Sequence, residues 1–254
     1  MPRTILISAV FVAAVAFRAA AAETTPDASA PEAGAKVTLI LNGLFGPLTN
    51  GYDESRTIHM FAEDGMVESS YSAKGGLGGE LALQYRLKPR LAIMLGATYV
   101  SGSAEDEYSA RLPHPLYLNK HRVVEGTLED LAYSEAAGHL SLAYVRDEGK
   151  TGYSLFAGPS FYQVSTEIVS RVDTTEAYPY DEVSARVVTE TLDNGAPGFH
   201  VGASLLHRLS PKLALGLQAR YGFATVKLSA NASDKETKVN AGGLLFGLGL
   251  RFGL

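Results

Sequence analysis

The sequence has no cysteine and no tryptophan among its 254 residues, and only 19% of the residues are charged. The lack of cysteine excludes a disulfide-stapled secreted domain and a cysteine-ligated metal site. The low charge, together with 46% hydrophobic residues, excludes an intrinsically disordered chain. No run of 18 apolar residues follows residue 22, so no membrane-spanning helix is expected there. What is abundant is glycine, with 26 residues, and tyrosine, with 13, in a chain long enough for one all-β domain.

The first 22 residues have the pattern of a secretory signal peptide. A basic start at Arg3 precedes an apolar run over residues 5–17, and the segment ends in Ala-x-Ala at Ala20 and Ala22. The run is shorter than the roughly 20 residues that a membrane-spanning helix needs, which favours cleavage over retention. We therefore expect residues 1–22 to be removed and residues 23–35 to form a flexible mature N-terminus.

Eight later segments alternate between apolar and small or polar residues, which is the period of a β-strand. In the segment 77–87, for example, Leu77, Leu81 and Leu83 share one face, while Glu80 and Gln84 share the other. One hairpin occurs twice, at residues 85–99 and 207–221, which is consistent with an up-and-down meander. The segments are 37–45, 77–87, 91–99, 134–145, 152–164, 199–209, 213–223 and 240–252.

The connections between these segments alternate in length. The short ones are residues 88–90, 147–151 and 210–212, and the long ones are 46–74, 102–133, 165–197 and 224–238. This asymmetry is typical of bacterial outer-membrane barrels, whereas a soluble sandwich or lipocalin-like barrel would bury larger residues on its inner face. The sequence predicts that residues 36–254 form an all-β, eight-stranded antiparallel up-and-down transmembrane β-barrel with short periplasmic turns and long extracellular loops.

One further segment, residues 183–192, could form a ninth strand. Arg186 and Glu190 lie on one parity, and Thr189 and Thr191 on the other, so neither face suits contact with hydrocarbon. We expect this segment to lie above the membrane and to pair with residues 165–172 as an extension of a hairpin.

With its signal peptide, its eight segments and its ending Gly247-Leu248-Gly249-Leu250-Arg251-Phe252, the sequence resembles the small outer-membrane β-barrel family of the OmpA/OmpX and opacity-protein type. In that family a glycine, alternating hydrophobic residues and a terminal aromatic are recognised by the barrel assembly machinery. The resemblance implies this role for Gly247, Leu250 and Phe252, although Gly253 and Leu254 follow the aromatic here. It also implies a place in the bacterial outer membrane, with membrane lipid, lipopolysaccharide and the assembly machinery as partners.

Polar residues gather on the face predicted to point into the barrel. Because the interior of an eight-stranded barrel is about wide enough for side chains to fill, a packed network of ion pairs and hydrogen bonds is favoured over an open pore. Glu80 is the single acid of this set, and we expect it to pair with Arg220 or Arg86. The set comprises Glu80, Gln84, Arg86, Arg208, Gln218, Arg220 and Arg251, with His139 and His200 added.

Three functions stay open at this point. The favoured one is a non-enzymatic outer-membrane barrel whose surface loops serve interaction, adhesion or envelope integrity. The first alternative is a small solute channel, an OmpW-like porin, through a narrow polar interior. The second is a lipid A-modifying enzyme in which His139 would activate Ser141, two residues away on the same strand face. We predict no catalytic, cofactor-binding or metal-binding residues.

The charges are unevenly distributed along the chain. The four long connections together contain 20 acidic and 10 basic residues, whereas basic residues gather near the short turns. An acidic outer rim disfavours nucleic-acid binding, while it leaves divalent cations and basic partners open.

Overall fold

The computed structural model describes residues 35–47, 51–176, 183–229 and 236–254. The predicted signal peptide and nearly all of the predicted flexible segment therefore lie outside the described residues. The described part contains nine strands: β1 (Val37–Gly46), β2 (Gly51–Met60), β3 (Glu63–Lys88), β4 (Leu91–Pro113), β5 (His121–Glu148), β6 (Thr151–Glu176), β7 (Val183–Arg208), β8 (Leu213–Ser229) and β9 (Glu236–Gly253).

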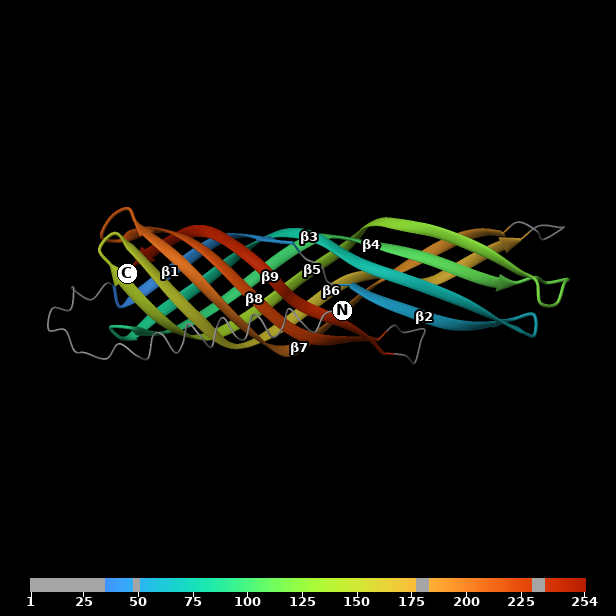
Figure 1. Ribbon diagram of the computed structural model, residues 1–254, viewed down its shortest axis with the longest axis horizontal. Helices are drawn as coiled ribbons and strands as arrows, with labels where there is room; N and C mark the ends of the chain where they lie inside the picture. The colour runs from blue at the N-terminus through green and yellow to red at the C-terminus, as the bar shows by residue number, and fades with distance from the viewer. Residues whose placement is uncertain (1–34, 48–50, 177–182, 230–235) are drawn as a thin grey trace.

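Eight of these strands close into a ring, as predicted. Consecutive strands from β3 to β9 pair antiparallel, and β1 pairs with β9 on one side and with β3 on the other (Figure 1). The closing pairs include Leu41 with Leu81 and Leu41 with Leu250. The ninth strand, β2, is a hairpin partner of the outer part of β3 and lies in a segment predicted as loop.

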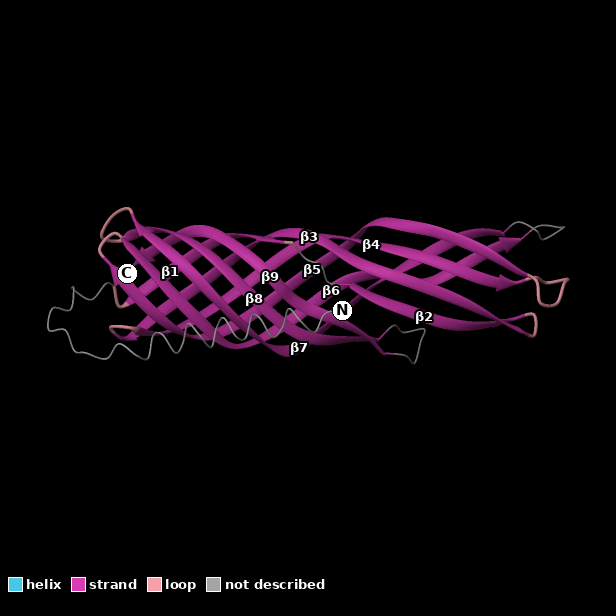
Figure 2. Cartoon of the chain, in the orientation of Figure 1, coloured by secondary structure: helices cyan, strands magenta, loops and turns pink. Residues whose placement is uncertain are grey.

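The prediction that the long connections would be loops was largely wrong, because most of their residues are strand. The strands β3 to β7 are 23 to 28 residues long, about twice what is needed to cross a bilayer (Figure 2). Three separate ladders continue outward, β2–β3–β4–β5, β6–β7 and β8–β9, whereas the pairing of β5 with β6 ends at Tyr133 and that of β7 with β8 ends at Gly198. Backbone groups inside each ladder are paired, and those on its edges are not paired between strands. The pairing expected for residues 183–192 is confirmed, since Thr166 pairs with Leu192 and Val172 with Val187.

The strand ends next to the short turns form what we call the membrane tier. Its outward side chains are large, apolar and exposed, including Leu95 at 63% and Leu217 at 54%. Its inward face carries many polar and small residues, as the alternation predicted, together with a buried apolar cluster that includes Ile40, Met94 and Phe156. The tier comprises residues 37–45, 77–87, 91–99, 136–144, 153–161, 199–209, 213–223 and 244–252.

The opposite ends of the strands, which we call the outer tier, have the reverse arrangement. On β8, Val226 and Leu228 point inward and are buried, whereas Thr225 and Lys227 are exposed. On β3, a register shift between Ala73 and Gly76 changes the parity. The outer tier, comprising residues 51–74, 102–133, 165–176, 183–192, 225–229 and 236–241, supplies much of the main hydrophobic core.

Candidate functional site

A polar cluster around Glu80 occupies the interior of the membrane tier. The carboxylate accepts hydrogen bonds from Asn42 Nδ2 at 2.7 Å and Gln218 Nε2 at 2.9 Å, and it forms an ion pair with Arg220. The Arg220 guanidinium also lies over the ring of Phe156, 5.5 Å from its centroid. Both members of the ion pair are buried. Each charge therefore compensates the other, because an unpaired charge in the interior would be costly.

Beside this cluster, hydrogen bonds join two histidines and three hydroxyl groups into one chain. His139 Nε2 lies 2.9 Å from Thr98 Oγ1, and its Nδ1 lies 2.8 Å from Ser160 Oγ. The Ser160 hydroxyl also lies 2.7 Å from His200 Nδ1, and His200 Nε2 lies 2.7 Å from Ser141 Oγ. A hydroxyl can donate one hydrogen bond and accept another, and so can a neutral imidazole, so the chain is satisfied in either of two directions.

The pairing of His139 with Ser141 that the enzyme alternative would require is not the one that the structure shows. The Ser141 hydroxyl contacts His200, and within the described residues both imidazoles hydrogen-bond to hydroxyl groups rather than to a carboxylate. A nucleophile-and-base pair normally has a third group that orients the base, commonly a carboxylate. The geometry therefore matches a hydrogen-bonded interior better than a hydrolytic site.

The predicted interior set divides into two groups rather than forming one network. Arg86 and Arg208 do not reach Glu80; both contact Asp147 Oδ2, at 2.6 and 3.1 Å, near the short turns. Gln84 and Arg251 lie with them at that end of the barrel, while Gln218 and Arg220 belong to the Glu80 cluster.

Several interior residues were absent from the predicted set. Asn42, Thr98 and Ser160 lie at inward-facing positions of their strands, so the alternation alone could have identified them. Asp147 was assigned to a turn, yet it lies at the end of β5 and its carboxylate is half-enclosed. Glu80 is also not the only inward acid.

A second buried acid, Glu135, lies just above the membrane tier. Its carboxylate accepts hydrogen bonds from the Tyr133 hydroxyl at 3.2 Å and from the Gly242 N–H at 2.8 Å. Gly242 has a φ of +95°, a conformation that favours glycine and that places its N–H beside this carboxylate.

The core of the outer tier closes the barrel above these polar groups. Tyr71 and Thr166 are buried there, and their hydroxyl oxygens lie 2.5 Å apart. Burial raises the pKa of Tyr71 to about 12. Just below, the Tyr162 hydroxyl occupies the space where Gly222 has no side chain, since a Cβ there would lie 2.0 Å from the oxygen.

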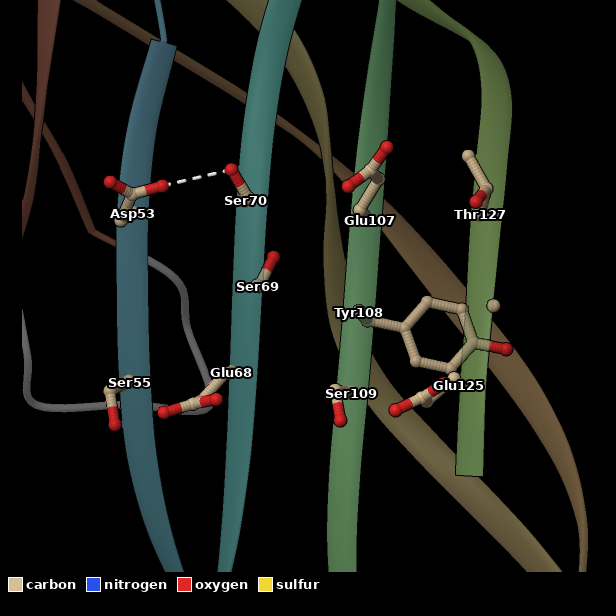
Figure 3. Close-up of a pocket in the computed structure, with 11 residues that line it drawn as sticks. Asp53, Ser55, Glu68, Ser69, Ser70, Glu107, Tyr108, Ser109, Glu125 and Thr127 are labelled. Carbon is tan, nitrogen blue, oxygen red and sulfur yellow. Dashed lines mark hydrogen bonds between the residues drawn. The ribbon is translucent and has the colours of Figure 1, made fainter. Parts of the chain in front are cut away.

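The outer surface of β2, β3, β4 and β5 in this tier presents acids and hydroxyls in alternation (Figure 3). Across the four strands, one row reads Asp53, Ser70, Glu107, Thr127 and the neighbouring row reads Ser55, Glu68, Ser109, Glu125. Each carboxylate therefore faces a hydroxyl across the strand pair, which avoids placing like charges directly opposite. Asp53 accepts a 2.9 Å hydrogen bond from Ser70. We call this surface the acid–hydroxyl face.

The three residues predicted to guide assembly lie on β9, the strand that closes the ring with β1. Gly247 faces the interior, where a Cβ would lie 3.1 Å from Leu44 Cδ2. Leu250 is exposed on the membrane side, and Phe252 pairs with Leu39 across the closing ladder. Their role in recognition stays a prediction.

Two other kinds of site were searched for in the described residues. No group of three or more histidine, aspartate or glutamate side chains among them is arranged to hold a metal ion. No helix within the described ranges is long and apolar enough to cross a membrane.

A closed antiparallel barrel with an apolar outer belt and a polar lining defines the class of this protein. In such a barrel every backbone polar group pairs between strands, and the outward side chains meet lipid. The chain therefore has the architecture of a transmembrane β-barrel. The short turns, the start of β1 and the end of β9 lie at one end of the barrel, and the outer tier forms the other end (Figure 1).

Solved structures of similar shape are outer-membrane barrels. OprG from Pseudomonas aeruginosa shares 11% identity over 86% of this chain and 96% of that one, with a TM-score of 0.49. Neisserial surface protein A shares 11% identity over 86% and 97% of the two chains, with a TM-score of 0.44. Ail of Yersinia pestis, the attachment invasion locus protein, shares 11% identity over 86% and 99%, with a TM-score of 0.39.

No protein-family model matches the sequence, and no curated protein matches it either. At such low identity no residue role passes from the similar structures to this chain.

Proposed function

We propose that this protein is a non-conducting, non-enzymatic outer-membrane barrel whose outer tier is a rigid platform for contact with a partner outside the cell. The observation that carries the proposal is the reversed arrangement of the outer tier. Its apolar interior lies above the membrane tier, with Val226 and Leu228 essentially inaccessible, while most of the exposed side chains on its outer surface are polar. Such a core excludes water from the path that a solute would need.

The membrane tier supports the same conclusion. The Glu80–Arg220 pair and the chain of hydroxyls and histidines fill the interior with side chains that bond one another. Charged residues packed this way hold the wall together and leave few groups to line a continuous aqueous path.

Conductance measurements in planar bilayers test whether the interior of the barrel is closed to ions. The refolded barrel should give no discrete current steps, while its heat-modifiable migration in gels and its protection from protease in vesicles verify folding and insertion. Reproducible unitary steps that change in Glu80→Gln would contradict the proposal and support the channel.

The platform itself can be tested by charge removal on the acid–hydroxyl face. Cells that display the barrel should bind a fluorescent oligolysine peptide, and Glu68→Gln with Glu107→Gln should weaken that binding. The matched control, Glu129→Gln with Asp193→Asn, removes two exposed charges outside this face. Equal losses in both pairs would show general charge attraction instead of a defined platform.

The enzyme alternative makes a different prediction. If the interior hydroxyls catalysed lipid modification, Ser141→Ala or His200→Ala would alter the mass spectrum of lipid A from cells that express the barrel. We expect the spectra to be identical to those from cells with the unchanged protein and from cells without it.

A further inference from the structure

A small cavity lies inside the barrel at its periplasmic end, apart from the Glu80 cluster. Its volume is about 100 Å³, and its wall combines β3, β5, β7 and β9 with the turn before β8. Its charged lining consists of Arg86, Arg208, Arg251, Lys212 and Asp147. Four cationic groups thus surround this space, against a single carboxylate.

Arg251 is the residue that this cavity leaves unsatisfied. It is only 5% exposed, yet its Nε and Nη2 have no hydrogen-bond partner among the described residues. Gly216 opposite leaves room for the guanidinium, since a Cβ there would lie 2.7 Å from Arg251 Nε. A buried cation with unused donors is costly, so a site of this kind favours an anion that accepts from it.

The two other arginines share one acceptor. Both Arg86 Nη2 and Arg208 Nη2 contact Asp147 Oδ2, at 2.6 and 3.1 Å, and Arg86 Nε has no partner in the described part of the chain. One carboxylate therefore balances three guanidinium groups and leaves two of their positive charges uncompensated, while the fourth cation, Lys212, is exposed to water.

We infer that this cavity binds a phosphate-class dianion from the periplasmic side. A phosphate group carries a charge of about −1.5 to −2 near pH 7, which matches the excess, whereas a monocarboxylate would leave part of it. Guanidinium groups also suit the oxygens of such an anion, because their N–H donors form a planar fork. The volume exceeds what one water requires, so a phosphate and its hydration fit.

The phosphate could be free inorganic phosphate or the phosphomonoester headgroup of an inner-leaflet lipid such as phosphatidic acid, because both carry the second negative charge that a phosphodiester lacks. The first experiment uses the full barrel, labelled with ¹⁵N-arginine, in maltoside micelles that contain no phosphate. Inorganic phosphate should shift the Arg251 Nε–H resonance with saturation, and Arg251→Gln should weaken binding about tenfold or more, as expected for lost charge-assisted hydrogen bonds.

The controls separate the site from general charge. Arg90→Gln removes one positive charge at the same end, but Arg90 is exposed and does not line the cavity, so binding should be unchanged. Asp147→Asn should instead tighten binding several-fold, because it frees Arg86 and Arg208 and removes the one opposing charge. A purely structural role for these residues predicts no such gain. If Arg251→Gln fails to show heat-modifiable folding, Arg208→Gln at the cavity rim provides the loss variant.

The second experiment identifies the source of the phosphate. The probe is a nanodisc of phosphatidylcholine and phosphatidic acid without added phosphate. If the Arg251 resonance is already at its bound position there and does not move when phosphate is added, the site is assigned to a lipid headgroup. A resonance that still titrates assigns it to the free anion. The proposal is overturned if no saturable shift occurs in either medium, or if Arg251→Gln and Arg90→Gln lose binding equally.

Discussion

The membrane tier and the outer tier are built from the same strands, yet they distribute apolar residues in opposite ways. On β8, Leu217 points outward in the membrane tier, and Val226 and Leu228 point inward in the outer tier, without any register shift against β9. The difference follows from the solvent outside: hydrocarbon around one tier and water around the other. The outward side chains are therefore apolar where they meet hydrocarbon and polar where they meet water. The inside of the barrel has no fixed polarity.

The largest effect should come from breaking the polar interior of the membrane tier. Glu80→Ala leaves Arg220 as an uncompensated buried charge, for which a loss of about 3–5 kcal/mol in the free energy of unfolding is expected. Urea titrations of the barrel in vesicles measure it. The double variant Glu80→Met with Arg220→Met should recover most of the loss, and no recovery would mean that the pair does more than balance charge.

The interior of the outer tier should respond to lost volume. Leu228→Ala truncates a side chain that is 1% exposed, and about 2–5 kcal/mol is expected for such a cavity in a packed core. The same titrations would detect it. Lys227→Ala, at the neighbouring outward position, should cost far less, and similar losses at both sites would contradict the reversed arrangement.

The outward surfaces of the two tiers should differ in their tolerance of charge. Leu217→Arg places a guanidinium against hydrocarbon and should destabilise the barrel by about 2–4 kcal/mol if the site is near the midplane. Thr225→Arg, on the same strand and the same face but in the outer tier, should be nearly neutral. Comparable folding yields for the two variants would place the membrane boundary elsewhere.

The smallest effect concerns Tyr71 in the outer core. Because burial raises its pKa to about 12, the folded protein retains this proton longer than the unfolded chain, in which tyrosine titrates near 10. Stability is therefore complete below pH 10 and falls as the pH rises from about 10 to 12. Thermal unfolding followed across that range should show the decline, and Tyr71→Phe should reduce its slope. Tyr85→Phe, at an exposed membrane-facing tyrosine, is the matched control.

Much of the barrel follows from alternation that is local in the sequence. The parity of residues 77–87 and 213–223 predicted which side chains face lipid, and the lengths of the connections predicted which end is periplasmic. The outward extension of the strands was missed. In the outer tier the apolar residues face inward and the polar residues face outward, so a search for strands with a lipid-facing apolar side classifies these segments as polar loops. The strand β2 was missed for the same reason.

The site residues show a sharper limit. Parity placed Glu80 and Arg220 inside, but it did not determine that Arg86 and Arg208 would contact Asp147 at the other end of the interior. Strand tilt and ring closure set the height of each residue along the barrel, and they depend on pairing between distant segments such as β1 and β9.

The sequence by itself determined the eight membrane-tier segments, the side on which their residues lie and the asymmetry of the two ends, because a period of two and turn spacing are properties of neighbouring residues. Only the tertiary structure decided which polar groups meet, that Ser160 joins two histidines and that Arg251 faces a cavity with unused donors. The contacts of Ser160 depend on the register between neighbouring strands, and those of Glu80 with Gln218 and Arg220 depend on ring closure, which brings residues 138 and 140 positions apart to the same level of one narrow interior.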